Sequence, residues 1–303
     1  MSEPSVSIVI AAWPDTAGLS DCLDALAGQR AEAHEVFVVT AKAPPFELVG
    51  RFDWVEWLVV GQDCLIPHLW GLGMSRATGD VVAISTTQFA PASGWLEALR
   101  SAHARLEAPA IGGPIGPPRG GRWVDWASYF LRYNTLLKYD HEQVADELSG
   151  DNASYRRSDL ESHPEVLRDG FWELEFHRRL QAEGRKLMYV PAVRVVQRAS
   201  FGFRDFLRQR FDHGTQFGRA RMRGRALPAR VLAATAAPLI PVVFLGKILW
   251  RVGRSGRDLG PFVASLPSLS CFLLAWSLGE VRGYLTAGQA QGPEVIRHGG
   301  IVT

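Results

Sequence analysis

The chain has 303 residues, of which 47% are hydrophobic and 21% are charged. This length predicts one large or two small domains, and the apolar content is enough for a sizeable core, which excludes an intrinsically disordered protein. The formal net charge is only +2, so the chain as a whole is neither strongly basic nor strongly acidic. Cys22, Cys64 and Cys271 lie far apart without a CxxC pair. Their spacing excludes a disulfide framework and a zinc site and indicates a reducing compartment.

The first 85 residues alternate between strand-like and helix-like segments. Short runs rich in β-branched residues predict strands over 6–12, 35–40, 55–60 and 80–85, with helices around 19–29 and 67–77 between them. Because strands and helices alternate, we expect an α/β fold in which helices cover a mostly parallel sheet. The opening sequence MSEPSVSIVIAA has no basic region before its short apolar run. We therefore expect it to form a buried strand rather than a signal peptide.

The next segments contain a helix and a loop rich in glycine and proline. Ser93 is the predicted N-cap of a helix with the sequence GWLEALRSAHARL, which is followed by an apolar run over 110–115. The loop GGPIGPPRGG lacks the Lys and the Ser or Thr of a nucleotide-binding loop, so we expect turns there rather than a phosphate site. The loop after the first strand, AAWPDTAG, lacks the GxGxxG pattern. A dinucleotide-binding dehydrogenase is therefore disfavoured.

The region from residue 198 to 230 is strongly basic, with nine arginines against Asp205 and Asp212. We expect an arginine-rich helix over 203–225, followed by uncharged runs over 231–246 and 259–279, each with two prolines. A membrane-spanning helix needs about 20 apolar residues, so the second run is long enough and the first is marginal. Arginines next to apolar runs attract anionic headgroups, which predicts membrane contact and a cytoplasmic location for the rest of the chain. A buried hairpin in a soluble domain is the alternative. No nucleic-acid partner is expected, because no recognised reading module accompanies the arginines.

The stretch from residue 149 to 191 carries the most specific pattern in the chain. It has the sequence SGDNASYRRSDL and then FWELEFHRRLQAEGRKLMYVP, with two carboxylates on a predicted helix. The block resembles the inverting nucleotide-sugar glycosyltransferases of family 2, whose GT-A fold carries G-x-N-x-A-x-R-R, an acidic pair, Arg-Leu, a glycine and a strand ending in proline. The segments SVSIVIAAWPD, GLGMSRATGDVVAIS and PASGWLEAL also look like that family, so the resemblance covers about the first 200 residues. The matching residues of the block are Gly150, Asn152, Ala153, Arg156, Arg157, Glu173, Glu175, Arg179, Leu180, Gly184 and Pro191.

Inverting sugar transfer needs a base close to the acceptor hydroxyl, and a carboxylate with a raised pKa suits that role. Trp172, Phe176 and Leu180 form an apolar stripe on the predicted helix. At about 100° per residue, Glu173 lies nearer to the centre of this stripe than Glu175 does. We therefore expect Glu173 to be the better buried carboxylate, and the resemblance implies that the base lies at this position. The alternative is that both carboxylates are solvated.

Other side chains of the block are expected around the base. His177 either orients Glu173 or packs in the core. Arg156 and Arg157 either bind phosphate oxygens or form ion pairs with nearby acids such as Asp159 and Glu161. The residues predicted to bind the acceptor or a phosphate group are Asp151, Asn152, Arg156, Arg157 and Trp172.

Ligands of open α/β sheets bind beyond the carboxyl ends of the strands. The resemblance implies a nucleotide-sugar donor at these ends, and the tryptophan that follows the first strand either stacks on the ligand or packs in the core. The residues predicted to bind the donor are Ala12, Trp13, Asp15, Thr40, Arg76, Thr86, Thr87 and Gln88.

The chain departs from the family at the expected metal site. The family places an Asp-x-Asp cluster at the end of the fourth strand, where a divalent cation bridges the donor diphosphate. Residues 85–88 are Ser, Thr, Thr and Gln, and Thr40 and Gln197 replace an aspartate and a histidine of the family. We therefore expect no tightly bound Mg²⁺ or Mn²⁺, and neutral and guanidinium groups would meet the diphosphate instead. Asp15 and Asp80 remain as alternative ligands for a cation, but both lie outside the motif position.

The sequence predicts a GT-A domain over 1–200, an arginine-rich helix over 201–230, an apolar hairpin over 231–285 and a tail over 286–303. The expected activity is hexosyl transfer from a nucleotide sugar to a lipid-linked or glycan acceptor at the cytoplasmic face of the cell membrane, as in polysaccharide biosynthesis. A catalytically silent GT-A scaffold that binds a partner enzyme or a glycan is the alternative. A glycosidase is disfavoured, because Glu173 and Glu175 point to different faces of their helix.

Overall fold

The computed structural model describes residues 3–13, 16, 18–61, 64–118, 121–168, 170–198 and 200–287. The chain divides into two compact units, which are described separately. Unit 1 comprises Met1–Arg119 and Tyr139–Ala199, and unit 2 comprises Gly120–Lys138 and Ser200–Thr303. Asp15, which the sequence places in the donor site, lies outside the described residues.

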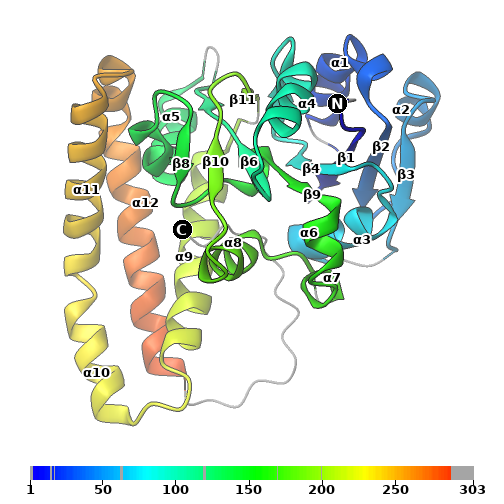
Figure 1. The fold of residues 1–303 in the computed structure, drawn as a ribbon. Helices are drawn as coiled ribbons and strands as arrows, with labels where there is room; N and C mark the ends of the chain where they lie inside the picture. The colour runs from blue at the N-terminus through cyan, green and yellow to red at the C-terminus, as the bar shows by residue number, and fades with distance from the viewer. Residues whose placement is uncertain are drawn as a thin grey trace. The chain divides into compact units, whose positions relative to one another are not determined.

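Unit 1 is built on an eight-stranded sheet with the strand order β3-β2-β1-β4-β9-β6-β10-β8 (Figure 1). Neighbouring strands are parallel except that β9 is antiparallel to β4 and β6, and β8 is antiparallel to β10. A second, three-stranded sheet has the order β5-β11-β7. This architecture is the α/β, mostly parallel fold that the sequence predicts. The strands are β1 (Val6–Ala12), β2 (Glu35–Thr40), β3 (Glu56–Val59), β4 (Val81–Thr86), β5 (Phe89–Pro91), β6 (Ala110–Gly112), β7 (Ile115–Gly116), β8 (Gln143–Ala145), β9 (Ala153–Arg156), β10 (Leu187–Tyr189) and β11 (Val195–Gln197).

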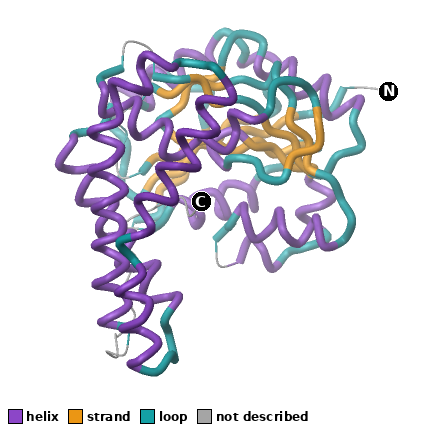
Figure 2. The backbone as a smooth tube through the Cα atoms, turned by 90° about the vertical axis from the view of Figure 1, so that its left-hand side faces the viewer, coloured by secondary structure: helices purple, strands orange, loops and turns teal. Residues whose placement is uncertain are grey.

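The helices of unit 1 pack against a layer of strands (Figure 2). Gly73 of α3 lies so close to β1 and β2 that a Cβ atom there would collide with the side chains of Val9 and Val39. Helix α4 begins after Gly94, which occupies the N-cap position with a φ of 73°, so the predicted cap at Ser93 is one residue too early. The helices are α1 (Leu19–Ala27), α2 (Phe46–Arg51), α3 (Ile66–Arg76), α4 (Trp95–Arg105), α6 (Arg157–Glu161), α7 (Glu165–Arg168) and α8 (Glu173–Ala182), with 3-10 turns η1 (Arg30–Glu32) and η3 (Gly150–Asn152).

Unit 2 is helical, and its central helix α12 packs against α9, α5, α10 and α11 (Figure 1). Glycines line the contact between α9 and α12: a Cβ atom on Gly218 would lie 2.6 Å from the carbonyl oxygen of Glu280, and Gly279 and Gly283 abut the backbone of α9 in the same way. The two helices therefore touch backbone to backbone. The elements are α5 (Trp123–Tyr133), η2 (Asn134–Lys138), α9 (Phe203–Arg221), α10 (Leu227–Ala236), α11 (Leu239–Ser255) and α12 (Leu259–Thr286).

Part of the arginine cluster lies inside unit 2 rather than at its surface. Arg210 is only 7% exposed, donates to Nδ1 of His213 at 2.8 Å and stacks on the rings of Phe206 and Trp276. The sequence assigns residues 120–138 to the GT-A domain, whereas α5 from this segment packs on α12, with 4.9 Å between the rings of Phe130 and Phe262.

Within the described residues, α12 is the one helix that is long and apolar enough to cross a membrane by itself. Helices α10 and α11 together pass the same test, but they are bent by 47° at the break between them. The break includes Pro238, one of the two prolines in the first apolar run, and proline is a common cause of such bends.

Candidate functional site

The parallel strands β1, β2 and β4 end at the same edge of the sheet. Ala12 is in register with Thr40, and Ala11 is in register with Thr86. The antiparallel strand β9 begins at this edge, because Ala153 pairs with Ile84. The turn of residues 149–152, which precedes β9, therefore lies beside the end of β4. We call this region the carboxyl edge.

Hydrogen bonds join the turn to the end of β4. The hydroxyl of Ser85 donates to the carbonyl of Asp151 at 3.0 Å, and the hydroxyl of Thr86 donates to Oδ1 of Asp151 at 3.3 Å. Only 1% of the surface of Asp151 is exposed. A carboxylate is thus present at the end of β4, although it comes from a segment 65 residues further along the chain than Thr86.

Glu173 is the first residue of α8 and lies against this turn. A Cβ atom on Gly150 would come within 3.1 Å of the carboxyl carbon of Glu173 and within 2.7 Å of the ring of Trp70. Trp70 is itself held by a hydrogen bond from Nε1 to the carbonyl of Ser85, at 2.7 Å. A glycine at position 150 is therefore what allows the carboxylate to approach the carboxyl edge.

The environment of Glu173 makes it a weaker acid than an ordinary glutamate side chain. The side chain is 8% exposed, whereas Glu175 is exposed, as the helical spacing predicts. The pKa of Glu173 is raised to about 7: burial is the largest cause, a hydrogen bond from its own backbone N–H lowers the pKa, and the negative charge of Asp151 raises it. A carboxylate with this pKa exchanges its proton near neutral pH, which is the property that a general base requires.

His177 packs in the core and does not orient the base. It is buried, and its Nε2 lies 2.9 Å from the hydroxyl of Tyr155. Burial lowers the pKa of His177 to about 3, so the ring is neutral at physiological pH. The packing alternative is the one that the structure supports.

The residues around Glu173 differ in how accessible they are. Trp172 is 38% exposed and meets the ring of His68 edge-on, with 6.4 Å between the centroids. Asn152 is buried and fully engaged: its Oδ1 accepts from Nε1 of Trp95 at 3.0 Å and its Nδ2 donates to the carbonyl of Val193 at 2.8 Å. Asn152 therefore holds the turn in place. Both of its amide atoms already have partners, so none is left for the predicted contact with an acceptor or phosphate.

The predicted donor-binding residues at the strand ends do come together. Ala12, Thr40, Thr86 and Thr87 lie at the carboxyl edge and are buried, while Trp13 and Gln88 are half-buried. The hydroxyl of Thr40 donates to the carbonyl of Lys42 at 2.9 Å. The helix α1 also begins at this edge, since a Cβ atom on Gly18 would lie 2.8 Å from the carbonyl oxygen of Thr87.

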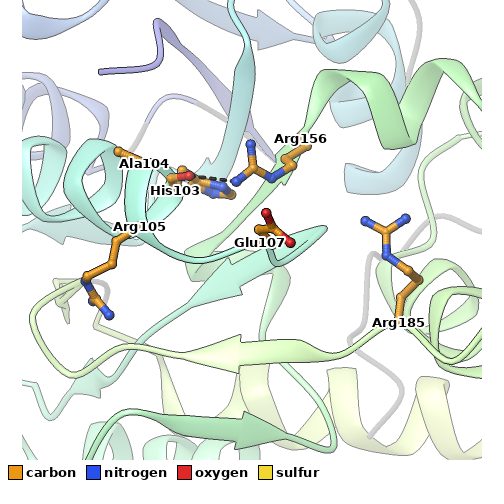
Figure 3. A pocket seen from close by; sticks show the side chains of 6 residues that line it. All are labelled: His103, Ala104, Arg105, Glu107, Arg156 and Arg185. Carbon is orange, nitrogen blue, oxygen red and sulfur yellow. Dashed lines mark hydrogen bonds between the residues drawn. The ribbon is translucent and has the colours of Figure 1, made fainter. Parts of the chain in front are cut away.

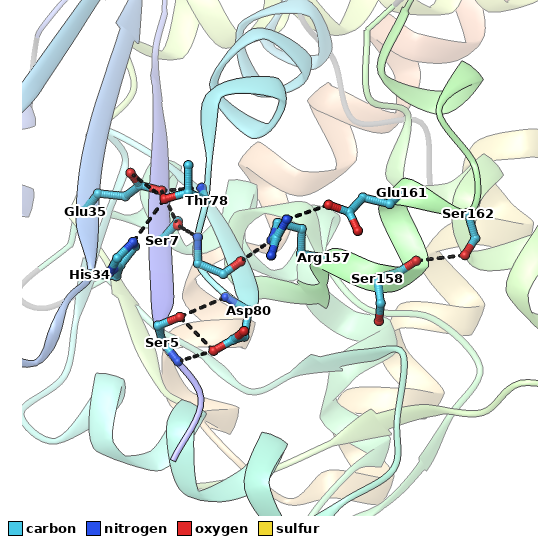
Figure 4. Close-up of polar contacts among 11 residues, drawn as sticks. Ser5, Ser7, His34, Glu35, Thr78, Asp80, Arg157, Ser158, Glu161 and Ser162 are labelled. Carbon is cyan, nitrogen blue, oxygen red and sulfur yellow. Dashed lines mark hydrogen bonds and ion pairs between the residues drawn. The ribbon is translucent and has the colours of Figure 1, made fainter. Parts of the chain in front are cut away.

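Three predicted arginines lie at the opposite, amino edge of the sheet. Arg156 pairs with Val81 at the start of β4, and Arg76 is exposed at the last position of α3, just before that strand. Arg157 donates to the carbonyl of Gly79 at 3.0 Å and to Glu161 at 2.5 Å, within a polar network that also contains the Ser5–Asp80 pair (Figure 4). The expectation that these arginines meet a donor phosphate at the carboxyl edge is therefore wrong. The strand β9 runs away from that edge, so residues that follow Asn152 closely in sequence end about 10 Å or more from it.

A pocket of about 510 Å³ opens beside Arg156 at the amino edge (Figure 3). The guanidinium of Arg156 donates to three backbone carbonyls, those of Ala108 at 3.0 Å, His103 at 2.6 Å and Leu106 at 2.8 Å. Arg105 and Arg185, which also line the pocket, form ion pairs with Glu142 and Asp159. The positive charges of this pocket are thus balanced locally. Its lining residues are His103, Ala104, Arg105, Glu107, Arg156 and Arg185.

The described residues contain no group of three or more His, Cys, Asp or Glu side chains that could hold a metal ion. Among the described residues of the carboxyl edge, the carboxylates are those of Asp151 and Glu173, and the first of these already accepts from Thr86. A divalent cation that binds together with a diphosphate has one or two protein carboxylates as ligands, so these two side chains would be its ligands here. The expectation that no Mg²⁺ or Mn²⁺ is tightly bound stays a prediction.

Reasoning from sequence missed two residues of the site. Trp70 lies in the middle of α3 and Gly150 in the turn before β9, and together they form the wall against which Glu173 packs. The sequence does indicate Gly150, because this glycine is the first residue of the G-x-N pattern. The tryptophan had none, because its contacts with Ser85 and residue 150 are distant in sequence.

No protein-family model and no curated protein matches the sequence. Among solved structures, the mannosyltransferase PcManGT from Pyrobaculum calidifontis, in complex with GDP-Man and Mn²⁺, is similar with a TM-score of 0.55 and 16% identity, covering 92% of this chain and 88% of that chain. GalNAc-T7 with UDP, GalNAc and Mn²⁺ is similar with a TM-score of 0.49 and 14% identity, covering 66% of this chain and 44% of that chain. The similarity to PcManGT, with the observed strand order, establishes that the chain has the GT-A-like fold that its sequence predicts.

Proposed function

We propose that this protein is an inverting glycosyltransferase that moves a hexose from a nucleotide sugar to a lipid-linked or glycan acceptor at the cytoplasmic face of the cell membrane. The observation that carries the proposal is the position of Glu173. Its carboxylate is buried beside the carboxyl edge and has a pKa of about 7. The GT-A-like fold adds support, because PcManGT, which shares it, was solved with GDP-Man.

In the proposed reaction, Glu173 accepts the proton of the acceptor hydroxyl as that oxygen attacks the anomeric carbon. The bond from the anomeric carbon to the nucleoside diphosphate breaks with inversion, and the diphosphate leaves with the bonding electrons. Trp172, exposed next to Glu173, is placed to stack on a sugar ring of the acceptor.

Transfer assays with a panel of nucleotide sugars and membrane-extracted acceptors test this proposal. We expect Glu173→Gln to lower kcat by about 10²–10⁴-fold, the range typical of a lost general base. Glu175→Gln is the matched control, because this carboxylate is exposed on the same helix, and it should leave kcat unchanged. Equal activity of wild type and Glu173→Gln would show that Glu173 is not the base.

A second function is a catalytically silent GT-A scaffold that binds a partner enzyme or a glycan. It is favoured by one observation: Thr86, Thr87 and Asp151 are each at most 2% exposed, so this part of the carboxyl edge is closed. Calorimetry with nucleotide sugars, with and without Mg²⁺ or Mn²⁺, separates the two functions. Donor binding that needs no metal supports the enzyme, whereas no binding to any donor supports the scaffold.

A further inference from the structure

Helix α12 is long and apolar enough to span a membrane, yet other helices of unit 2 pack against it along most of its length. Near its start, Phe262 packs on Phe130 of α5 with ring centroids 4.9 Å apart. Further along, Phe272 packs on Phe206 of α9 at 4.7 Å, and at its end Thr286 accepts from Nε of Arg219 at 3.0 Å. From residue 262 to 286, about 36 Å of helix, α12 therefore runs beside α5 and then α9.

Helix α9 cannot accompany α12 through a bilayer. A charged side chain at the centre of a membrane helix costs about 2.5–3.5 kcal/mol even on the mildest scale, and α9 has charges along its whole length. The glycine contact prevents α12 from separating from it, because the backbones touch at Gly214, Gly218, Gly279 and Gly283. The charged residues of α9 are Arg204, Asp205, Arg208, Arg210, Asp212, Arg219 and Arg221.

The side of α12 that faces away from α9 is apolar and exposed. At about 100° per residue, its exposed large apolar residues fall within one stripe about 100° wide, whose centre lies roughly 170° around the helix from Gly279 and Gly283. The stripe runs for about 39 Å, which is longer than the hydrocarbon core of about 30 Å. A helix that lies in the plane of the membrane has no such length limit. The stripe consists of Leu259, Val263, Leu274, Leu278 and Leu285.

Helix α11 has the same two-sided character. Pro241, Ile248 and Val252 are its buried residues, and its exposed apolar residues lie on another face. Lys247 lies within this exposed face, with its Nζ over the ring of Phe244, and its long side chain reaches the headgroups by snorkelling. The exposed apolar residues are Leu239, Val242, Val243, Phe244, Leu249 and Trp250.

Both ends of the α10–α11 pair are basic. Arg221, Arg223 and Arg225 are exposed before α10, and Arg254 and Arg257 are exposed at the end of α11. A helix pair that crossed a membrane would place one cluster on each side, whereas short flanking loops normally carry their Lys and Arg on the cytoplasmic side alone. Two basic ends are expected of a helix pair that lies along the membrane surface, because both ends then contact the headgroups of the same anionic leaflet.

We propose that unit 2 is a monotopic membrane anchor: the exposed apolar faces of α11 and α12 enter a single anionic leaflet, and no helix crosses the bilayer. This inference rests on the membrane association proposed above and specifies its form. Such an interfacial arrangement buries an apolar face about 5–10 Å deep and leaves the charged α9 at the headgroups.

Thiol labelling of the full chain in sealed membrane vesicles from the expression host tests the topology. The native cysteines are replaced by serine, and Arg225→Cys or Arg257→Cys then marks one end of the α10–α11 pair. A membrane-impermeant maleimide should label both positions to the same extent with and without detergent, provided that the cytoplasmic face is outward. Phe46 of α2 is 85% exposed, so labelling of Phe46→Cys shows on which side of the membrane unit 1 lies. Labelling of only one of the two ends before detergent would mean that the pair crosses the membrane, which overturns the proposal.

Vesicle sedimentation separates this failure from the failure of membrane association itself. We expect binding to phosphatidylglycerol-containing vesicles to exceed binding to phosphatidylcholine vesicles, and Val242→Asp with Val263→Asp to weaken it by about tenfold or more. Phe46→Asp is the matched control and should bind as wild type does. Binding to neither vesicle overturns both proposals. A stable dimer in sedimentation velocity, which the same two aspartates dissociate, would assign the apolar face to a second copy of the chain and also overturn the anchor.

Discussion

Asp151 and Glu173 form a pair of buried carboxylates in which the charge of one raises the pKa of the other. The neighbouring titratable side chains are neutral at pH 7, because burial lowers the pKa of His177 to about 3 and raises that of Tyr155 well above its usual value. Asp151 is therefore the neighbour whose charge raises the pKa of Glu173, the proposed base. The pair contains one residue from the turn before β9 and one from the start of α8.

Asp151→Asn should shift the acid limb of the activity profile to lower pH. Removing the negative charge makes ionisation of Glu173 easier, while burial, the larger cause, keeps its pKa above the ordinary value of 4.5. The measurement is kcat/KM against pH for wild type, Asp151→Asn and Glu175→Gln, the last as the control. A variant with lower activity but an unshifted limb would mean that Asp151 has only a structural role.

Glu173→Gln should make the protein more stable at alkaline pH. The pKa of Glu173 is about 7 in the folded chain, against 4.5 as its ordinary value, so the folded state binds more protons between these limits. Stability due to this group is therefore full below about pH 4.5 and falls as the pH rises to 7. The glutamine variant avoids this loss, on the order of 3 kcal/mol by pH 8. Denaturant unfolding of wild type and variant at pH 5 and pH 8 measures this loss. A difference in the free energy of unfolding between the two proteins that is the same at both pH values would contradict the burial of Glu173.

Arg156→Met should lower stability without changing donor affinity. The substitution leaves three backbone carbonyls without their guanidinium donor, which costs about 1–3 kcal/mol. Arg76→Met is the matched control, because Arg76 is exposed at the same edge and its loss should stay within about 0.5 kcal/mol. Thermal unfolding and donor calorimetry are the two measurements. Weaker donor binding by the Arg156 variant would place that side chain in the donor site after all.

Gly218→Ala should destabilise unit 2. Its Cβ atom would lie 2.6 Å from the carbonyl oxygen of Glu280, so α9 and α12 would have to move apart. Overpacking of this kind costs about 1–3 kcal/mol. Gly246→Ala in α11 is the control: nothing lies within 4 Å of its Cβ position, and alanine favours a helix by about 1 kcal/mol over glycine. Circular dichroism melting compares them, and an unchanged midpoint for Gly218→Ala would mean that the helices are not in backbone contact.

The parts of the fold that follow from local pattern were predicted well. The β-branched runs at residues 6–12 and 35–40 are β1 and β2, and the spacing around Phe176 correctly separated buried Glu173 from exposed Glu175. These features depend on contacts within one element or on the period of that element.

The features that were missed depend on long-range pairing. Nothing local to Arg156 indicates that β9 runs antiparallel between β4 and β6, so the arginine was expected at the wrong edge. Likewise, the sequence around Phe130 does not indicate that α5 packs on Phe262, more than 130 residues away. The carboxylate at the end of β4 was expected to be missing, and Asp151 reaches it only through the three-dimensional fold.

The backbone contact between α9 and α12 also restricts how this chain can evolve. Positions 214, 218, 279 and 283 cannot gain a single carbon without forcing the helix axes apart. Outward-facing positions such as Leu274 and Leu278 carry no such limit on size, so apolar residues of different sizes are tolerated there. Homologues of this chain should therefore keep four small residues at the seam and vary in side-chain size, but not in apolar character, on the opposite face.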